Sequence, residues 1–148
     1  MCRISEKKSF RTINCIFLCD NQGQMLSMGE PISGEQHDLY KIEETLEEVL
    51  SLLSDADIEC KGLFLNIDSG FDNKKCRDIL EKKEITANIK ENPRNGDTKH
   101  EKYFDSELYK RRFKIEKANA WLDSFKAILI RFETLNLTWM NLHYLASI

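Results

Sequence analysis

Apolar positions in the first half of the chain form short runs typical of strands and one periodic segment typical of a helix. Residues 12–19 are apolar on both sides, and residues 24–28 follow after a polar Asp-Asn-Gln-Gly turn, so the two predict a β-hairpin. A loop is expected over 29–34. From Asp38, which can cap a helix, to about residue 53, apolar residues recur at helical spacing. The recurring positions are Leu39, Ile42, Leu46, Val49, Leu50 and Leu53.

The second half continues with two short strands and several helices. Residues 62–67 and 84–89 predict strands, and residues 73–82 predict a short helix between them. After a polar loop over 90–102, one long helix is expected over 105–133 and a closing helix over 135–148. The apolar stripe of the long helix is Ala118, Trp121, Leu122, Phe125, Ile128, Leu129 and Phe132, and that of the closing helix is Trp139, Leu142 and Leu145.

The order of these elements indicates an α/β layer domain. A sheet built from such buried runs would need one more central strand, and the pattern predicts none before Thr12. The length of 148 residues suits one domain, and 41% hydrophobic with 32% charged residues is a soluble globular composition. No apolar run is long enough to span a membrane, and the start lacks the apolar region of a signal peptide. We therefore expect a cytoplasmic protein.

Charge changes this picture, because it is distributed unevenly. The net charge is −3, yet residues 109–131 contain seven bases against two acids, whereas residues 30–60 contain ten acids and one base. The basic segment is either a solvated helix face or a surface for a polyanion such as DNA.

The five cysteines form no CxxC pair, and the three histidines have no zinc-type spacing. Reduced structural thiols are therefore expected.

Two acids stand out as candidates for holding a metal. Asp68 ends the apolar strand 62–67, and strand ends of open α/β sheets are where ligands and metals are held. The ordinary alternative is a turn or a helix start. Glu116 lies on the same side of the long helix as Tyr109, Arg112 and Asp123, and its ordinary alternative is an i,i+4 ion pair with Arg112.

Other polar and aromatic residues have simpler interpretations. Asp20 is expected to serve the turn beside Gly23, and Asp72 to cap the helix over 73–82. Trp121 and Trp139 lie on apolar stripes and are expected in the core. There is no GxSxG, no glycine-rich phosphate loop and no Cys–His pair at a suggestive spacing.

The segment "LYKRRFKIEKANAWLDSFKAILIRFET" strongly resembles the C-terminal block of bacterial DDE insertion-sequence transposases, and "GLFLNIDSGFDNKKCRDIL" resembles their second-aspartate block. "KKSFRTINCIFLCDNQGQML" and "PISGEQHDLYKIEE" resemble the two preceding segments. The similarity runs from about Lys7 to Ile148 in the family's order, and the Tyr-x-x-Arg-x-x-x-Glu spacing at Tyr109, Arg112 and Glu116 is specific.

The resemblance implies a fold and an activity. The fold would be ribonuclease-H-like, a mixed sheet flanked by helices, with residues 1–148 a single partial catalytic domain. It would hold Mg²⁺ (or Mn²⁺), with Asp68 matching the second acid and Glu116 the third, and would cut and join the ends of an insertion sequence. Double-stranded DNA of the terminal repeats would be the partner, contacted by Tyr109 and Arg112 together with the bases Lys126 and Arg131. The family's lysine seven residues after the glutamate is Asp123 here.

The resemblance also implies a departure. In the family, the first acid lies on the first strand, upstream of "KKSFRTIN", and neither Asp20 nor Asp38 matches it. We therefore expect a fold truncated at its N-terminus, without the first strand, and inactive alone. The alternative is a non-catalytic remnant that binds DNA or pairs with intact transposase. A third, weaker alternative is a nuclease that acts without transposition. A homo-oligomer and association with the nucleoid are further expectations.

Overall fold

The structure, a computed structural model of the chain, describes residues 2–5, 13–36, 39–93 and 103–148. Its strands form two small sheets. One sheet is antiparallel and has the order β1 (Cys2–Ser5), β2 (Ile13–Cys19) and β3 (Met25–Met28), with β4 (Ile32–Ser33) also paired to β2. The other consists of β5 (Phe64–Ile67) and β6 (Thr86–Ile89), which run parallel.

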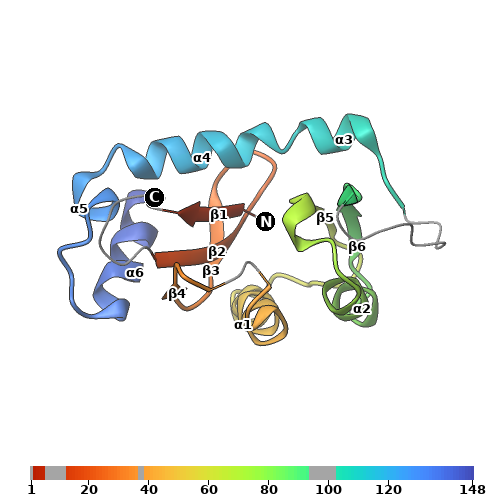
Figure 1. Cartoon of the computed structure of the whole chain (residues 1–148), viewed down its shortest axis with the longest axis horizontal. Helices are drawn as coiled ribbons and strands as arrows, with labels where there is room; N and C mark the ends of the chain where they lie inside the picture. The colour runs from red at the N-terminus through yellow and green to blue at the C-terminus, as the bar shows by residue number, and fades with distance from the viewer. Residues whose placement is uncertain (1, 6–12, 37–38, 94–102) are drawn as a thin grey trace.

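Helices lie on both sides of these strands (Figure 1). Helices α1 (Ile42–Asp55) and α2 (Lys74–Lys82) lie on one side. Helices α3 (Ser106–Lys110) and α4 (Phe113–Asp123) form a nearly continuous row on the other side, above both sheets. The short α5 (Lys126–Leu129) and α6 (Asn136–Ala146) close the end of the molecule beside β1–β4. The arrangement is a mixed α/β fold, as the sequence predicted, but with two small sheets in place of one.

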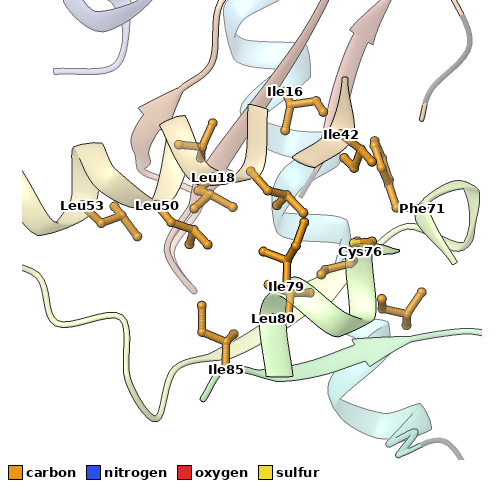
Figure 2. Packing of buried hydrophobic residues seen from close by; sticks show 14 residues of the cluster. Ile16, Leu18, Ile42, Leu50, Leu53, Phe71, Cys76, Ile79, Leu80 and Ile85 are labelled. Atoms are coloured by element: carbon orange, nitrogen blue, oxygen red, sulfur yellow. The ribbon is translucent and has the colours of Figure 1, made fainter. Parts of the chain in front are cut away.

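The predicted hairpin of β2 and β3 is confirmed. Its first strand, β2, lies in the middle of the sheet and contributes side chains to two hydrophobic clusters. Because side chains alternate along a strand, Ile16 and Leu18 of β2 enter one cluster, whereas Cys15 and Phe17 enter the other. The first cluster, shown in Figure 2, joins β2 to α1, α2 and the buried residues around β5 and β6. The second joins β2 and β3 to α4, α5 and α6. Strand β2 therefore holds the two halves of the molecule together.

Most predicted elements are present with small shifts of their ends. Strands β5 and β6 and helices α1, α2 and α6 lie within or beside their predicted ranges. Asn73 accepts a hydrogen bond from the Cys76 amide at 2.7 Å and caps α2, so the prediction that Asp72 caps this helix is wrong. Asp38, the predicted cap of α1, lies outside the described residues. Trp139 is buried, as expected.

Two predictions of elements are wrong. The pattern predicted no strand before Thr12, yet β1 pairs along β2 from Cys2 opposite Phe17 to Ser5 opposite Asn14. Four residues with two polar side chains give too weak a hydrophobic signal to predict a strand.

The predicted helix over 105–133 is divided into α3, α4 and α5. At Phe125 the backbone becomes extended, although no glycine or proline marks this break. The predicted apolar stripe is therefore only partly buried: Leu122 and Ile128 are in the core, whereas Trp121 is 59% exposed and Phe132 75% exposed. The expectation of a buried Trp121 is wrong for the same reason.

The thiols behave as the composition predicted. Cys15, Cys19, Cys60 and Cys76 form no disulfide bond. Burial raises the pKa of Cys15 to about 12 and that of Cys76 to about 11, so both stay protonated. In the part of the chain that the structure describes, no helix is long and apolar enough to cross a membrane.

Candidate functional site

The candidate site begins where β5 ends, at Asp68. This residue caps the short 3₁₀ turn η1 (Ser69–Phe71): its Oδ1 accepts a hydrogen bond from the Gly70 amide at 3.0 Å. The turn follows β5 because Asp favours extended backbone with a local amide partner. Its second oxygen, Oδ2, is left to face the row of helices above the sheet. The turn interpretation of Asp68 is therefore correct, and it leaves one carboxylate oxygen for another partner.

A pair of asparagines, Asn88 buried and Asn66 half-buried, fixes the start of α3 over these strands. Asn66 of β5 and Asn88 of β6 are paired in register, and Asn88 Nδ2 donates to Asn66 Oδ1 at 2.7 Å. Asn88 also donates to the Asp105 carbonyl at 2.9 Å and accepts from the Asp105 amide at 2.8 Å. Asn66 donates to the Leu108 carbonyl at 3.0 Å. These bonds anchor the first turn of α3 to the two parallel strands.

Asp105 then begins α3 in the expected manner. Its Oδ1 accepts from the amides of Glu107 and Leu108, both at 2.9 Å, which satisfies two amides of the first helical turn. The amides of Arg111, Arg112, Lys114 and Ile115 each donate to the carbonyl three residues earlier, which joins α3 to α4. The anchoring of α3 thus sets where Tyr109, Arg112 and Glu116 lie relative to β5 and β6.

Arg112 contacts both candidate acids. One terminal nitrogen, Nη1, donates to Asp68 Oδ2, and the other, Nη2, lies 3.5 Å from Glu116 Oε1. The Arg112 side chain is 24% exposed, while the side chains of Asp68 and Glu116 are 38% and 64% exposed. The two acids come from separate elements and converge on one cationic group. The i,i+4 pair expected from helix spacing is present, and it is extended by Asp68.

Tyr109 completes this side of the helix row. Its ring lies beside Arg112, with 5.6 Å from the guanidinium carbon to the ring centroid, and beside Phe104, with 5.2 Å between centroids. Burial raises the pKa of the Tyr109 hydroxyl; the nearby Arg112 charge opposes this rise and the Asp68 charge adds to it. Tyr109 therefore stays neutral, and Arg112 packs against its ring.

A cavity of about 290 Å³ lies next to Arg112, between the end of β2, strand β5 and the α3–α4 row. Three bases of the row, Arg111, Arg112 and Lys114, line it together with Asp20 and Asn66. Asp20 accepts from the amides of Gln22 and Gln24, both at 2.8 Å, which confirms its predicted role in the turn. The cavity therefore places Arg112 beside two further bases, and neither Asp68 nor Glu116 is among its lining residues.

The remaining predicted bases lie elsewhere. Lys126 begins α5, at the far end of α4 from Arg112 (Figure 1). Arg131 donates to the Glu133 carbonyl at 2.8 Å and to Asn136 Oδ1 at 2.7 Å, and it lies over the Trp139 ring. The structure therefore brings Tyr109 and Arg112 together with Asp68 and Glu116, but it separates Lys126 and Arg131 from them.

Two carboxylates converging on a cation are the kind of donor set that binds a hard divalent ion. Among the described residues no group of three or more Asp, Glu, His or Cys side chains could hold a metal. Asp72 is nearly fully buried and is engaged by Arg77, with 2.7 Å between Arg77 Nη2 and Asp72 Oδ1. The acids available to a metal at this position are therefore Asp68 and Glu116.

Sequence reasoning missed the asparagine pair. The signal was present, because β5 and β6 each carry Asn followed by Ile at the same register position, in "LNI" and "ANI". An amide repeated in two buried parallel strands indicates a hydrogen-bonding partner, since buried polar groups are nearly always satisfied. Nothing in the local sequence pointed to Asp105 as that partner.

One of the comparisons with known proteins identifies a family. Neither the curated proteins nor the solved structures yielded a match to the chain. A family model described as "Transposase DDE domain" matches residues 2–148, which is nearly the whole chain. The chain therefore belongs to the transposase DDE domain family.

Proposed function

We propose that the chain acts in DNA transposition as part of a DDE catalytic centre of a bacterial insertion sequence, in which Asp68 and Glu116 hold Mg²⁺ or Mn²⁺. The observation that carries the proposal is the convergence of these two carboxylates on the single guanidinium of Arg112. The family match supports it, because transposase DDE domains generally use a divalent metal. The fold proposed is ribonuclease-H-like, with β5 and β6 as its parallel strands.

The donor chemistry fits one ion better than two. Mg²⁺ is commonly bound through one or two carboxylates together with substrate phosphates and waters, and a pair of acids meets that need. When bound, the metal would polarise a phosphate and activate the attacking oxygen. Asp68 would keep its Oδ1 on the Gly70 amide and present Oδ2 to the ion. Glu116, the more exposed acid, would approach from the helix row.

Basic residues beside the acids would bind the DNA backbone. Arg111, Arg112 and Lys114 line one cavity, and Arg112 also pairs with Asp68. A guanidinium binds phosphate well because its nitrogens can donate in pairs. The Tyr109 ring would support Arg112 by packing against its guanidinium. We extend the proposed DNA face along the row to Lys126 and, more weakly, to Arg131, whose donors are already engaged by backbone carbonyls and Asn136.

We further propose that residues 1–148, a single partial domain, do not catalyse strand transfer alone. Two carboxylates hold both ions of a two-metal reaction poorly, and among the described residues no group of three or more candidate ligands is present. The same observation favours the second candidate function, a non-catalytic protein that occupies DNA ends or pairs with an intact transposase. A homo-oligomer is compatible with either function, and both place the protein with cytoplasmic, nucleoid-associated DNA.

Metal binding tests the proposed site. Isothermal titration of the purified chain with Mg²⁺ and with Mn²⁺ should show binding that is lost in Asp68→Asn and weakened in Glu116→Gln. Asp123→Asn, which removes an exposed acid from the same helix, is the matched control and should bind as the unaltered chain does. Equal binding by Asp68→Asn and Asp123→Asn would refute the site.

Duplex binding tests the proposed DNA face. Removing the charges of Arg112 and Lys126 should weaken affinity and reduce the slope of log K against log salt by about one for each DNA phosphate that is no longer neutralised. The two single variants separate the ends of the row: a change confined to Arg112→Gln would restrict the DNA face to the neighbourhood of Asp68. Metal-dependent cleavage of terminal-repeat DNA by the chain alone would overturn the claim of inactivity.

A further inference from the structure

Arg112 lies between the two acids that we propose as metal ligands. Its two terminal nitrogens reach one carboxylate each, Asp68 through Nη1 and Glu116 through Nη2. A dication bound to the same carboxylate oxygens would meet the positive guanidinium at close range, where like charges repel. The ion pair and the metal complex therefore exclude each other unless Arg112 moves.

The surroundings offer Arg112 a place to move. The cavity of about 290 Å³ is lined by Arg112 itself and by Arg111 and Lys114, and it opens beside the strand that ends at Asp68. The lining holds three bases against one acid, Asp20, whose Oδ1 accepts two backbone amides of its own turn. A guanidinium released from Asp68 and Glu116 would therefore sit among bases and need an anion. A phosphate of the DNA backbone supplies that anion, with the oxygens that a guanidinium binds in pairs.

We infer that Arg112 couples metal binding to DNA binding: it pairs with Asp68 and Glu116 when the site is empty and transfers to a DNA phosphate when a metal takes the acids. The inference rests on the proposed function. Metal binding frees Arg112 for phosphate, and phosphate binding frees the acids for metal. By linkage, each ligand must then raise the affinity of the other by the same factor.

Arg112 in this scheme is a positioning residue for both ligands, and Asn66 and Asn88 support it. Their hydrogen bonds to Leu108 and Asp105 hold the α3 turn that precedes it. Because the α3 turn before Arg112 is anchored to the strands, the exchange of partners requires rotation of the side chain only. The coupling therefore needs no rearrangement of the fold.

The test is a thermodynamic cycle on the whole chain. Titration calorimetry measures the Kd of Mg²⁺ with and without a saturating blunt-ended DNA duplex, for the unaltered chain and for Arg112→Gln. In the unaltered chain the duplex should tighten Mg²⁺ binding by about five-fold or more, the low end of ordinary coupling. In Arg112→Gln, Mg²⁺ should bind more tightly than in the unaltered chain without DNA, and the duplex should no longer change its Kd.

A neighbouring base serves as the matched control. Lys110 lies two residues earlier and pairs with Glu107, not with either candidate acid. Lys110→Gln removes the same charge and should keep both the Mg²⁺ affinity and the coupling factor. Because each coupling factor is a ratio within one variant, a loss of folded protein does not imitate a loss of coupling.

The outcomes separate the two proposals. If the unaltered chain bound no Mg²⁺, or if Asp68→Asn bound it equally well, the proposed function would fail and the coupling with it. If Asp68→Asn abolished binding while Arg112→Gln bound Mg²⁺ no more tightly than the unaltered chain, or kept the coupling factor, the metal site would stand and the inference about Arg112 would be overturned.

Discussion

The two hydrophobic clusters that share β2 differ in composition and in what they support. The first cluster packs α1 and α2 against β2, β5 and β6, and its buried members are aliphatic except for Phe71 and Cys76 (Figure 2). The second packs α4, α5 and α6 against the other side of β2. Beside it lies His143, buried against the Trp139 ring, with a Nε2 atom that has no hydrogen-bond partner among the described residues.

The exposed apolar surface follows the same division. Large apolar side chains that face solvent gather on the C-terminal helices and the segments between them. They are Phe113, Trp121, Phe125, Leu129, Ile130, Phe132, Leu135, Leu137, Leu145 and Ile148, and elsewhere Leu26, Tyr40, Phe64, Tyr103 and Phe104 are also exposed. The first cluster therefore forms a well-packed support for the Asp68 turn, whereas the second covers only part of the apolar surface of its helices. Asp68 therefore follows a fully buried residue, Ile67, whereas the far end of the basic helix row lies among exposed apolar side chains.

The largest expected effect comes from removing core volume in the first cluster. Leu46 is fully buried in α1, and Leu46→Ala should lower the free energy of unfolding by about 2–5 kcal/mol. Urea denaturation followed by circular dichroism reports all helices, while fluorescence reports Trp121 and Trp139 on the C-terminal helices. Because β2 belongs to both clusters, both signals should shift together.

Leu26→Ala is the control for this variant, since Leu26 is 38% exposed on β3 and its truncation should change the free energy of unfolding by less than about 0.5 kcal/mol. An unshifted fluorescence transition in Leu46→Ala would mean that the two clusters unfold separately.

A smaller effect is expected at the hydrogen bonds that connect the strands to the helix row. Asn88→Ala leaves Asn66 Oδ1 and the Asp105 amide without their partner, which should lower the free energy of unfolding by about 1–3 kcal/mol. Relative to the unaltered chain, amide hydrogen exchange in Asn88→Ala should become faster in α3 more than in α2. Asn141→Ala, an exposed position of α6, is the comparison and should leave α3 exchange unchanged. Equal protection of α3 in both variants would contradict the anchoring role.

The smallest effect concerns pH and the second cluster. Burial lowers the pKa of His143 below its usual 6.5, and the hydrogen bond with the Trp139 carbonyl only partly offsets this. Between the lowered pKa of His143 in the folded chain and 6.5, the unfolded chain binds more protons than the folded chain. The stability that His143 contributes is therefore fully present above pH 6.5 and declines as the pH falls through this window. The slope of unfolding free energy against pH should decrease in His143→Leu and persist in Leu46→Ala. The same slope in both variants would remove His143 as its cause.

Local patterns were sufficient for the elements around the first cluster. The helical spacing of apolar residues predicted α1, and the hairpin followed from two apolar runs with a polar turn between them. The break at Phe125 was not predictable, because the apolar stripe continues through it without glycine or proline. A stripe predicts a helix only where every turn can pack against a partner, and the C-terminal helices leave much of theirs exposed.

The candidate site shows the same limit. The Tyr-x-x-Arg-x-x-x-Glu spacing placed Tyr109, Arg112 and Glu116 on one helix side, and the sequence placed Asp68 at the end of a strand. Their catalytic and metal-binding roles stay a prediction. The predicted role of Asp72 was wrong: adjacent Asp72 and Asn73 both suit a cap, but Asn73 caps the helix, while Asp72 accepts from Arg77 and from the Asn92 amide.

Signals that lie within a few residues of one another were enough to specify the strand β2, the helical spacing of α1 and the turn at Asp20. The position of Arg112 between Asp68 and Glu116 has a different origin, because it arises from packing between distant segments. That contact depends on Asn66 and Asn88 holding α3 over the parallel strands, through hydrogen bonds between segments far apart in the chain. Such bonds form only after the strands have paired, so no local pattern of side chains specifies them.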